Sequence, residues 1–245
     1  MTSRADAAGA AMPYAAMVLG ATGNVGGRIV QVLIASELCR RVVVVTRRKT
    51  GAFTHAKVTE VVVNMDHLEA EVAPHVQGVD VALAAFGVGR GSAQMADEEV
   101  RRIEVAYPLA FCRAAKAAGA RVAGVMTAAG AHADSRMKYV RIIGEKEQAA
   151  ESVGFDFLGL YRPGVILGNS NTPGYLETVM PLLHWAMPSK YRSIHKDNLA
   201  RAMVAQSEQA LAALGARGAQ TAPVVKRLEY ADMAPFFVAG DRQQP

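Results

Sequence analysis

The amino-acid sequence predicts an α/β fold with a doubly wound parallel sheet and helices on both of its faces. Two observations support this prediction. Six short runs are rich in Val, Ile and Leu and nearly continuous in apolar residues, which is typical of strands in a sheet buried on both sides. Longer stretches with helical periodicity separate these runs, so strands and helices alternate along the chain.

The expected strands show little alternation between polar and apolar residues. The first strand ends at a glycine-rich turn, and the second ends at a run of basic residues. We expect strands over Met17–Gly20, Val42–Thr46, Val58–Val63, Val79–Phe86, Val122–Thr127 and Phe155–Tyr161. We expect helices over Val25–Ser36, Ala96–Ala118, Ser135–Ser152, Tyr175–Trp185 and Asp197–Leu214. Asp197 stands at the N-cap position of the last helix, just before its first apolar residues.

The chain shows no internal repeat and no long polar linker that would separate domains. Residues 1–13 are Ala-rich and lack the apolar core of a signal peptide, so we expect them to form a flexible N-terminal tail. After Tyr161 several Gly and Pro residues interrupt the regular pattern. We therefore expect one domain over residues 14–245, with a small C-terminal elaboration on the substrate side from about residue 162.

Composition excludes several classes of protein. The 245 residues carry 27 Lys and Arg against 22 Asp and Glu, and the apolar fraction of 51% is that of a globular protein. Two distant cysteines exclude a disulfide framework, and the six histidines lack metal-ligand spacing, so we expect no metal. The basic residues form no stripe, so we expect no nucleic-acid partner. No apolar run is long enough for a membrane span, and we expect a cytoplasmic protein.

The most informative motif follows the first expected strand and opens the first expected helix. Its residues are Gly20, Ala21, Thr22, Gly23, Asn24, Val25, Gly26 and Gly27. At this point the chain must turn tightly, and a pyrophosphate must approach the main-chain N–H groups of a helix N-terminus, so a Cβ is excluded. A glycine trio alone is often only a turn. Its position between strand and helix predicts a dinucleotide-binding Rossmann fold, with Gly20, Thr22, Gly23, Asn24, Val25 and Gly26 at the cofactor.

The second expected strand ends in Arg47 and Arg48, where an NAD-preferring site has an acidic residue for the ribose hydroxyl. An Arg guanidinium matches a 2′-phosphate instead, so the sequence predicts NADP(H) as the cofactor. The alternative is that both arginines form a solvated strand end. Arg162, at the end of the sixth strand, is a further candidate for the cofactor edge, although an arginine there is commonly structural.

Two further segments end strands at the same edge of the predicted sheet. Asn64 and Met65 follow the third strand, where they would flank an adenine. Phe86, Gly87 and Arg90 belong to a glycine-rich bend after the fourth strand, where the cofactor would cross the sheet. The alternative for this bend is a flexible loop without a ligand.

These motifs together resemble those of the atypical short-chain dehydrogenase/reductases, in the branch that includes Tat-interacting-protein-like and NmrA-like proteins. The resemblance covers about residues 17–203 and implies an NADP-binding Rossmann protein with a poorly defined substrate. It is carried by Gly20-x-x-Gly23-x-x-Gly26, Arg47-Arg48, Asp80-Val81 before Phe86-Gly87, Gly89-Arg90-Gly91 and Tyr161-Arg162-Pro163-Gly164-Val165.

The resemblance also implies a catalytic Tyr with a Lys one helical turn later, and a Ser or Thr that orients the substrate carbonyl. Tyr139 matches the Tyr, but Ile143 stands at the Lys position, and Lys146 lies about two turns away. Thr127 retains a hydroxyl after the fifth strand. Without a neighbouring cation, Tyr139 should keep a pKa near ~10, which suits proton donation better than abstraction. Tyr139 is alternatively a helix residue that packs against the sheet.

Two functions from different classes fit these residues. The first is a slow NADP(H)-dependent reductase of a small carbonyl or quinone, with Tyr139 or a bound water as the proton donor and Thr127 as a hydrogen-bond partner. The second is a non-catalytic NADP(H)-binding protein that senses redox state or has an assembly or regulatory role. The eroded Tyr–Lys pair favours the second, whereas the intact cofactor motif fits both. The sequence leaves the substrate unknown and is compatible with a homodimer or a protein partner.

Overall fold

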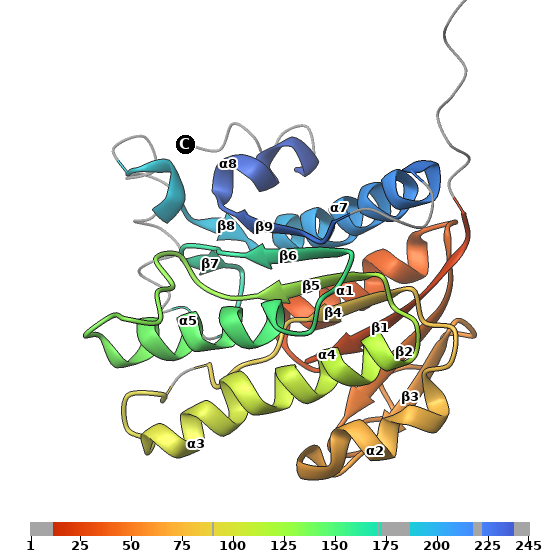
Figure 1. Ribbon diagram of the computed structural model, residues 1–245, viewed down its shortest axis with the longest axis horizontal. Coiled ribbons are helices and arrows are strands. Elements are labelled where there is room, and N and C mark those ends of the chain that lie inside the picture. The colour runs from red at the N-terminus through yellow and green to blue at the C-terminus, as the bar shows by residue number, and fades with distance from the viewer. Residues whose placement is uncertain (1–11, 90, 171, 173–186, 218–221, 238–245) are drawn as a thin grey trace, which may run out of the picture.

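A computed structural model describes residues 12–89, 91–170, 172, 187–217 and 222–237 (Figure 1). Its centre is a seven-stranded sheet in the order β3-β2-β1-β4-β5-β6-β9. Every neighbouring pair in this sheet is parallel. The strands are β1 (Tyr14–Leu19), β2 (Cys39–Thr46), β3 (Val58–Val62), β4 (Val81–Ala84), β5 (Val122–Met126), β6 (Phe157–Tyr161) and β9 (Val224–Leu228). This order confirms the predicted α/β fold with a doubly wound parallel sheet.

Helices cover both faces of the sheet, as predicted (Figure 1). The helices α1 (Asn24–Ala35) and α7 (Lys196–Arg217) pack together on one face. The other face carries α2 (Leu68–Val72), α3 (Asp97–Arg101), a π-helical turn (Arg102–Ala106), α4 (Tyr107–Ala117) and α5 (Lys138–Glu151).

Two hydrophobic cores result, one on each side of the sheet. Alternate side chains of β1 point to opposite faces, as the pleat requires. Val18 packs in the core beneath α1 and α7, together with Ile29 and Met203. Leu19 packs in the other core, with Phe111 of α4. A sheet buried on both faces explains why its central strands are nearly continuous in apolar residues.

The helix predicted over Ala96–Ala118 is observed as α3, the π-helical turn and α4 in direct succession. Within this run the N–H of Tyr107 donates to the carbonyl of Arg102, five residues earlier. A π-turn inside an α-helix widens it by one residue and often marks a functional site. Here it carries Glu104, which is buried.

Several elements near the C-terminus were not predicted. They are β9, the two-stranded parallel sheet of β7 (Ile166–Leu167) and β8 (Ile194–His195), and the short helix α8 (Tyr230–Met233). Within the described residues, short 3₁₀ turns lie at Met65–His67, Ala73–His75, Ser189–Tyr191 and Ala234–Phe236. β9 escaped prediction because it is a partly exposed edge strand with two basic residues in five.

The prediction that Asp197 caps α7 was wrong, because the helix begins one residue earlier, at Lys196. Asp197 lies in the first turn and accepts hydrogen bonds from Arg28 of α1, with Nε–Oδ1 at 2.6 Å and Nη2–Oδ2 at 3.0 Å. Its carboxylate therefore joins the two helices that cover one face of the sheet. The helix predicted over Tyr175–Trp185 lies outside the described residues, as does all of the predicted tail except Met12 and Pro13.

Candidate functional site

The loop between β1 and α1 is built around two close backbone approaches. Gly20 has a positive φ of +85°, and a Cβ there would lie 2.3 Å from the carbonyl oxygen of Ala85, at the end of β4. A Cβ on Gly26 would lie 2.1 Å from the carbonyl oxygen of Gly20. Both positions therefore require glycine, which lets the loop fold tightly onto the carboxyl edge of the sheet.

The N-terminus of α1 faces the same edge. Gly23 occupies its N-cap position without a side-chain cap, and the first turn carries no acidic residue. The unpaired N–H groups and the helix dipole therefore present positive charge at this point. Such a helix end is a site for an anionic group.

A first cavity, of about 300 Å³, lies beside this loop; we call it the arginine cavity. Arg47 and Arg48 line it where β2 ends, and no acidic residue is among its described lining residues. Neither arginine has a hydrogen-bond or ion-pair partner within the described part of the chain. Of the other residues predicted to contact a cofactor, those that line this cavity are Gly20, Thr22, Gly23, Met65, Phe86 and Gly87.

Glu60 of β3 holds the turn that follows Arg48. Its Oε1 accepts hydrogen bonds from the Thr50 N–H at 2.9 Å, the Thr50 hydroxyl at 2.8 Å and the Thr46 hydroxyl at 3.3 Å. Burial opposes ionisation of this carboxyl, but the hydrogen bonds from Thr50, Gly51 and Thr46 outweigh it and lower the pKa of Glu60. Glu60 is thus a carboxylate whose hydrogen bonds fix the turn that directly follows both arginines.

Asn64 does not line the arginine cavity. Its side chain instead caps the 3₁₀ turn at Met65–His67 by accepting the N–H of Asp66 at 3.0 Å. Arg90, also predicted at the cofactor, lies outside the described residues. Gly26 allows the close backbone approach to Gly20 within the loop, and it does not line the arginine cavity.

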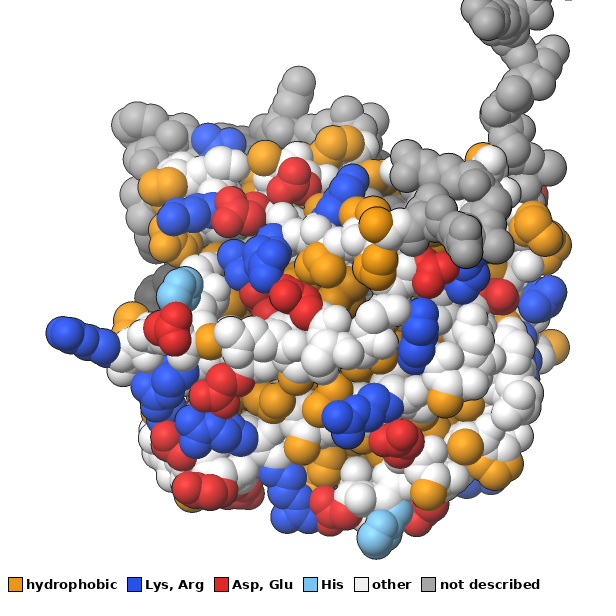
Figure 2. Space-filling model, viewed as in Figure 1, with side chains coloured by type: hydrophobic (Ala, Val, Ile, Leu, Met, Phe, Trp, Pro, Cys, Tyr) orange, Lys and Arg blue, Asp and Glu red, His pale blue; other side chains and the backbone are white. Residues whose placement is uncertain are grey.

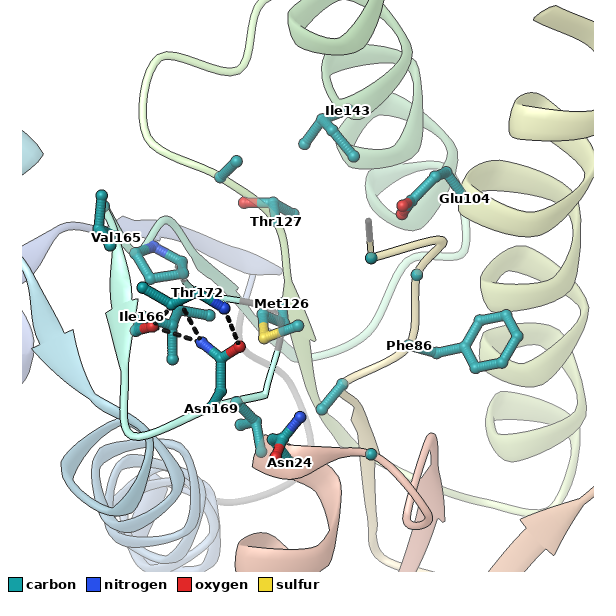
Figure 3. Close-up of a pocket in the computed structure, with 18 of the residues that line it drawn as sticks. Asn24, Phe86, Glu104, Met126, Thr127, Ile143, Val165, Ile166, Asn169 and Thr172 are labelled. Atoms are coloured by element: carbon teal, nitrogen blue, oxygen red, sulfur yellow. Dashed lines mark hydrogen bonds between the residues drawn. The ribbon is translucent and has the colours of Figure 1, made fainter. Parts of the chain in front are cut away.

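A second cavity, of about 380 Å³, adjoins the first, and we call it the tyrosine cavity because Tyr139 lines it. Figure 3 shows other residues of its wall, among them Thr127. Asn24 and Val25, at the start of α1, line it as well. Ala85, Phe86, Gly87 and Gly23 line both cavities, so these residues form the wall that the two share.

Tyr139, Ile143 and Lys146 line the tyrosine cavity from one face of α5, as the spacing i, i+4, i+7 requires. Tyr139 is 41% exposed at the rim, which disfavours the alternative that it packs against the sheet, whereas Ile143 is 1% exposed. Lys146 is only 2% exposed, and its Nζ lies 3.1 Å from Oε2 of Glu104. The cavity therefore contains a lysine, but its charge is already paired.

The pKa of Tyr139 was expected near the ordinary value for tyrosine, and the structure corrects this. Partial burial of the side chain at the rim raises the pKa, and the negative charge of Glu104 raises it further. The Tyr139 phenol therefore stays protonated at neutral pH. It can donate a proton to a reacting group, but it is a poor base.

Thr127 and Arg162 meet on a third buried group, Glu147 of α5. The Thr127 hydroxyl is 2.9 Å from Oε1 of Glu147 and 3.1 Å from the carbonyl oxygen of Tyr161. Arg162 donates from Nε to Oε1 of Glu147 at 2.8 Å and from Nη2 to Oε2. Arg162 therefore lies on Glu147, and it lines neither cavity. The pKa of Arg162 is raised by its hydrogen bonds to Glu147.

The far wall of the tyrosine cavity comes from the segment after β6, which was predicted only as an elaboration. Figure 3 shows Val165, Ile166, Asn169 and Thr172 of this segment on one side and Ile143 and Glu104 on the other. Asn169 and Thr172 bind each other, with Nδ2–Oγ1 at 2.9 Å and the Thr172 N–H to Oδ1 at 3.0 Å. The Tyr-Arg-Pro-Gly motif signalled this segment, whereas nothing in the local sequence signalled Glu104 or Glu147.

The described residues contain no cluster of three His, Cys, Asp or Glu side chains that would suit a metal ion. Among their helices, none has both the length and the apolar character needed to cross a lipid bilayer. On the face seen in Figure 2, basic and acidic side chains are interspersed over the surface.

Comparison with known proteins defines the class to which this fold and site belong. Residues 20–210 match the family described as NAD(P)H-binding. The chain belongs to this family, and the strand order of its sheet is Rossmann-like.

Two named relatives are similar to this chain. Protein HTATIP2 from Rattus norvegicus is 34% identical over 152 residues, which cover 61% of this chain and 62% of the relative. A protein from Lodderomyces elongisporus named "Protein FMP52, mitochondrial" is 30% identical over 167 residues, which cover 65% of this chain and 70% of the relative. The match thus spans less than two thirds of the rat protein's length.

Solved structures share the fold at low sequence identity. A short-chain dehydrogenase from Burkholderia cenocepacia in complex with NADP superposes with a TM-score of 0.62 over 91% of this chain and 92% of that one, at 14% identity. A short-chain dehydrogenase family protein from Francisella tularensis gives a TM-score of 0.64 at 11% identity, over 91% of this chain and 99% of that one. At these identities the likeness concerns the fold alone.

Proposed function

We propose that the protein is a slow NADP(H)-dependent reductase of a small carbonyl compound or quinone. The observation that carries the proposal is the pair of arginines in the arginine cavity. Arg47 and Arg48 have no partner among the described residues, and no carboxylate lies in the described wall to accept a ribose hydroxyl. Unpaired guanidinium groups at this position suit a 2′-phosphate.

The remaining features of the cleft fit a dinucleotide. A Cβ at Gly20 or Gly26 would collide with backbone atoms, so glycine at both positions allows the loop to fold tightly. A tightly folded glycine loop lets its main chain approach a pyrophosphate closely. The uncapped N-terminus of α1 supplies main-chain donors beside Gly23. Gly20, Thr22, Gly23, Asn24 and Val25 would therefore hold the pyrophosphate, with Arg47 and Arg48 on the 2′-phosphate and Met65 beside the adenine.

The tyrosine cavity would hold the reacting groups. A reduced nicotinamide supplies a hydride when it is bound. Tyr139 would donate its phenolic proton to the carbonyl oxygen of the substrate and then recover a proton from water. The Thr127 hydroxyl now donates its hydrogen bond to Glu147 or to the Tyr161 carbonyl. Thr127 would orient the substrate oxygen only after this hydroxyl rotates toward it. The lack of a lysine at position 143 removes an acid–base partner that typically contributes ~10²–10⁴-fold in rate, so turnover should be slow.

The lining of this cavity favours an uncharged substrate. Its described wall is largely apolar, and Met126, Ile143 and Ile166 contribute to it. The charged groups in that described wall are Glu104 and Lys146, which neutralise each other. A carboxylate or phosphate substrate would find no unpaired cation in this part of the chain, whereas an aldehyde, ketone or quinone needs none.

Calorimetric titration with NADPH and NADH tests the choice of cofactor. Replacement of Arg47 and Arg48 by Ala should weaken NADPH binding by ~1.5–3 kcal/mol per lost charged hydrogen bond and leave NADH little affected. The matched control is R40A/R113A, which removes the same charge outside both cavities. Equal losses for both cofactors would show that the two arginines do not recognise a phosphate.

Turnover of NADPH with a panel of quinones and aldehydes tests the reductase itself. We expect slow turnover that Tyr139→Phe reduces, with an unchanged Kd for NADPH. If the wild-type protein binds NADPH tightly but reduces none of these compounds, the reductase proposal fails.

The alternative is a non-catalytic NADP(H)-binding protein with a redox-sensing, assembly or regulatory role. The observation that favours it is the tyrosine cavity itself, where Ile143 stands at the lysine position and Glu104 and Lys146 pair with each other. In that case NADPH should change the affinity for a partner protein or a second copy of the chain. Light scattering with and without NADPH would detect the second of these.

The cytoplasmic location remains a prediction. The Lodderomyces relative carries the word mitochondrial in its name, which is a statement about that protein. Cell fractionation followed by detection of the untagged chain would distinguish the two compartments.

A further inference from the structure

The buried ion pair between Glu104 and Lys146 lies directly beneath the turn that separates the two cavities. Oε1 of Glu104 accepts the N–H of Val88 at 2.8 Å, and Oε2 accepts Nζ of Lys146 at 3.1 Å. The same Nζ donates to the carbonyl oxygen of Phe86 at 2.9 Å. The two side chains thus hold the turn at residues 86–88 by its main-chain atoms from both sides.

The fit between this pair and the turn is close. A Cβ on Gly87 would lie 2.6 Å from Oε1 of Glu104. Figure 3 shows Glu104 reaching from its helix toward the cavity. It stands in the π-helical turn Arg102–Ala106, whose extra residue breaks the regular helical spacing at this point. The pair therefore fixes the position and orientation of Gly87 in the wall that the two cavities share.

Packing of the helices does not explain why this pair is charged. Partly exposed ion pairs already join α3 to α5, because Arg101 lies 2.8 Å from Glu145 and Lys138 lies 2.7 Å from Asp97. A buried ion pair is a weak source of stability, since well-packed apolar residues in its place are often neutral or stabilising. What apolar residues could not do is hold the Val88 N–H and the Phe86 carbonyl.

We propose that Glu104 and Lys146 are a positioning pair that holds the turn at residues 86–88 in the shape that accepts the nicotinamide half of the dinucleotide. The inference rests on the proposed function, because a dinucleotide that spans both cavities must cross this turn. The adenosine half would be held by the arginine cavity and needs the pair less. Position 143 has no lysine, and Lys146, one turn further on, donates to the main chain of the turn and to Glu104.

The test compares a whole dinucleotide with its adenosine half. The variant E104M/K146M removes both charges together, so that no unpaired charge is left buried. Its matched control is R101M/E145M, which removes a neighbouring ion pair between α3 and α5 outside the cavity. Calorimetry with NADPH should show a Kd about tenfold weaker for E104M/K146M, and 2′,5′-ADP should bind within about twofold of the wild type. The control variant should bind both ligands as the wild type does.

Two results would overturn the inference: an unchanged Kd for NADPH, or an equal weakening of both ligands. A wild-type protein that binds neither ligand would refute the proposed function and this inference together. Hydrogen exchange supplies a measurement without ligand. The peptide that contains Val88 should exchange faster in E104M/K146M than in R101M/E145M, and equal rates would show that the pair does not hold the turn. Thermal melting of both variants shows that each is folded.

Discussion

The two adjoining cavities differ in what their charged groups already do. In the arginine cavity, Arg47 and Arg48 have no partner in the described part of the chain, and Glu60 stabilises the turn that presents them. In the tyrosine cavity, Glu104 and Lys146 pair with each other. An anionic ligand is bound by unpaired cations, whereas paired charges hold protein in place. The charges of the first cavity therefore suit an anionic ligand, whereas those of the second stabilise the protein around the cavity.

For the proposed reductase, this difference separates two sets of features. Cofactor binding would need the tight backbone of the loop before α1 and the two arginines that have no partner in the described part of the chain. Fast proton transfer would need a cation next to Tyr139, and Ile143 lies there instead. We therefore expect substitutions to affect cofactor binding and turnover separately.

The largest effect is expected from Gly26→Ala in the loop that serves both cavities. The new Cβ would lie 2.1 Å from the carbonyl oxygen of Gly20, so the loop must move. We expect NADPH binding to be lost and the free energy of unfolding to fall by ~1–3 kcal/mol, the usual cost of overpacking. Urea unfolding and calorimetry measure the two effects.

The neighbouring Gly27→Ala is the matched control. Its Cβ would lie 3.3 Å from the carbonyl oxygen of Ala21, a contact that a small shift relieves. It should retain NADPH binding. Similar behaviour of the two variants would mean that the close approach at Gly26 does not shape the cofactor site.

A second prediction restores the missing cation through Ile143→Lys. The new ammonium would lower the pKa of Tyr139 and bind close to the reacting groups, so NADPH turnover should rise by at least ~10-fold, toward the ~10²-fold that an acid–base partner contributes. Because Ile143 is buried, the melting temperature should fall. Steady-state absorbance of NADPH with a quinone measures the rate.

Val140→Lys adds the same charge to the same helix outside the cavity and serves as the control. If Ile143→Lys is folded, binds NADPH and is no faster than this control, the site is not an eroded reductase. The comparison of the two cavities would then favour the non-catalytic alternative.

These expectations also show which parts of the molecule the sequence could predict. The run of Val residues predicted strand β2, and the position of the glycines between a strand and a helix predicted the tight turn before α1, because both are set by local sequence. Glu104 and Lys146 are 42 residues apart in the sequence, and Glu147 and Thr127 are 20 residues apart. The first pairing arises from the packing of α5 against the π-helical turn, and the second from the packing of α5 against the end of β5. The sequence likewise predicted Arg162 at the cofactor, because its contact with Glu147 of α5 becomes apparent only in the folded chain.

A third, smaller effect is expected from Glu60→Ala behind the arginine cavity. Loss of the hydrogen bonds to Thr50 and Thr46 should loosen the turn and weaken NADPH binding by about 3- to 10-fold, the equivalent of one hydrogen bond, with NADH unchanged. Glu60→Gln retains an acceptor for Thr50 and should recover part of the loss. Calorimetry with both cofactors measures the split.

Glu69→Ala removes an equal charge from an exposed position on α2 and controls for long-range electrostatics. Removal of a carboxylate near a phosphate could also strengthen binding. Tighter NADPH binding in Glu60→Ala than in Glu69→Ala would show that Glu60 repels the phosphate, and the assignment of Glu60 as a tether would be wrong.

The smallest effect is expected far from both cavities, at the amino edge of the sheet. Asp156 precedes β6 and accepts hydrogen bonds from Arg121 Nε at 2.7 Å and Lys116 Nζ at 3.3 Å. The hydrogen bond from Arg121 lowers the pKa of Asp156 most, burial opposes it, and Lys116 lowers it further. Because the folded-state pKa is below the unfolded value of ~3.9, this contribution to stability is present above about pH 4 and is lost as the pH falls through the folded-state pKa.

Asp156→Asn should therefore lower the free energy of unfolding by less than about 1 kcal/mol at pH 7, since the pair is partly exposed. The difference from the wild type should shrink in urea unfolding below about pH 4, where the carboxyl of the unfolded wild-type chain becomes protonated. NADPH affinity at pH 7 should not change, because this pair holds only the structure. A change in NADPH affinity equal to that of E104M/K146M would mean that any lost ion pair weakens the cofactor site. The distinction between paired charges near the cleft and paired charges elsewhere would then have no basis.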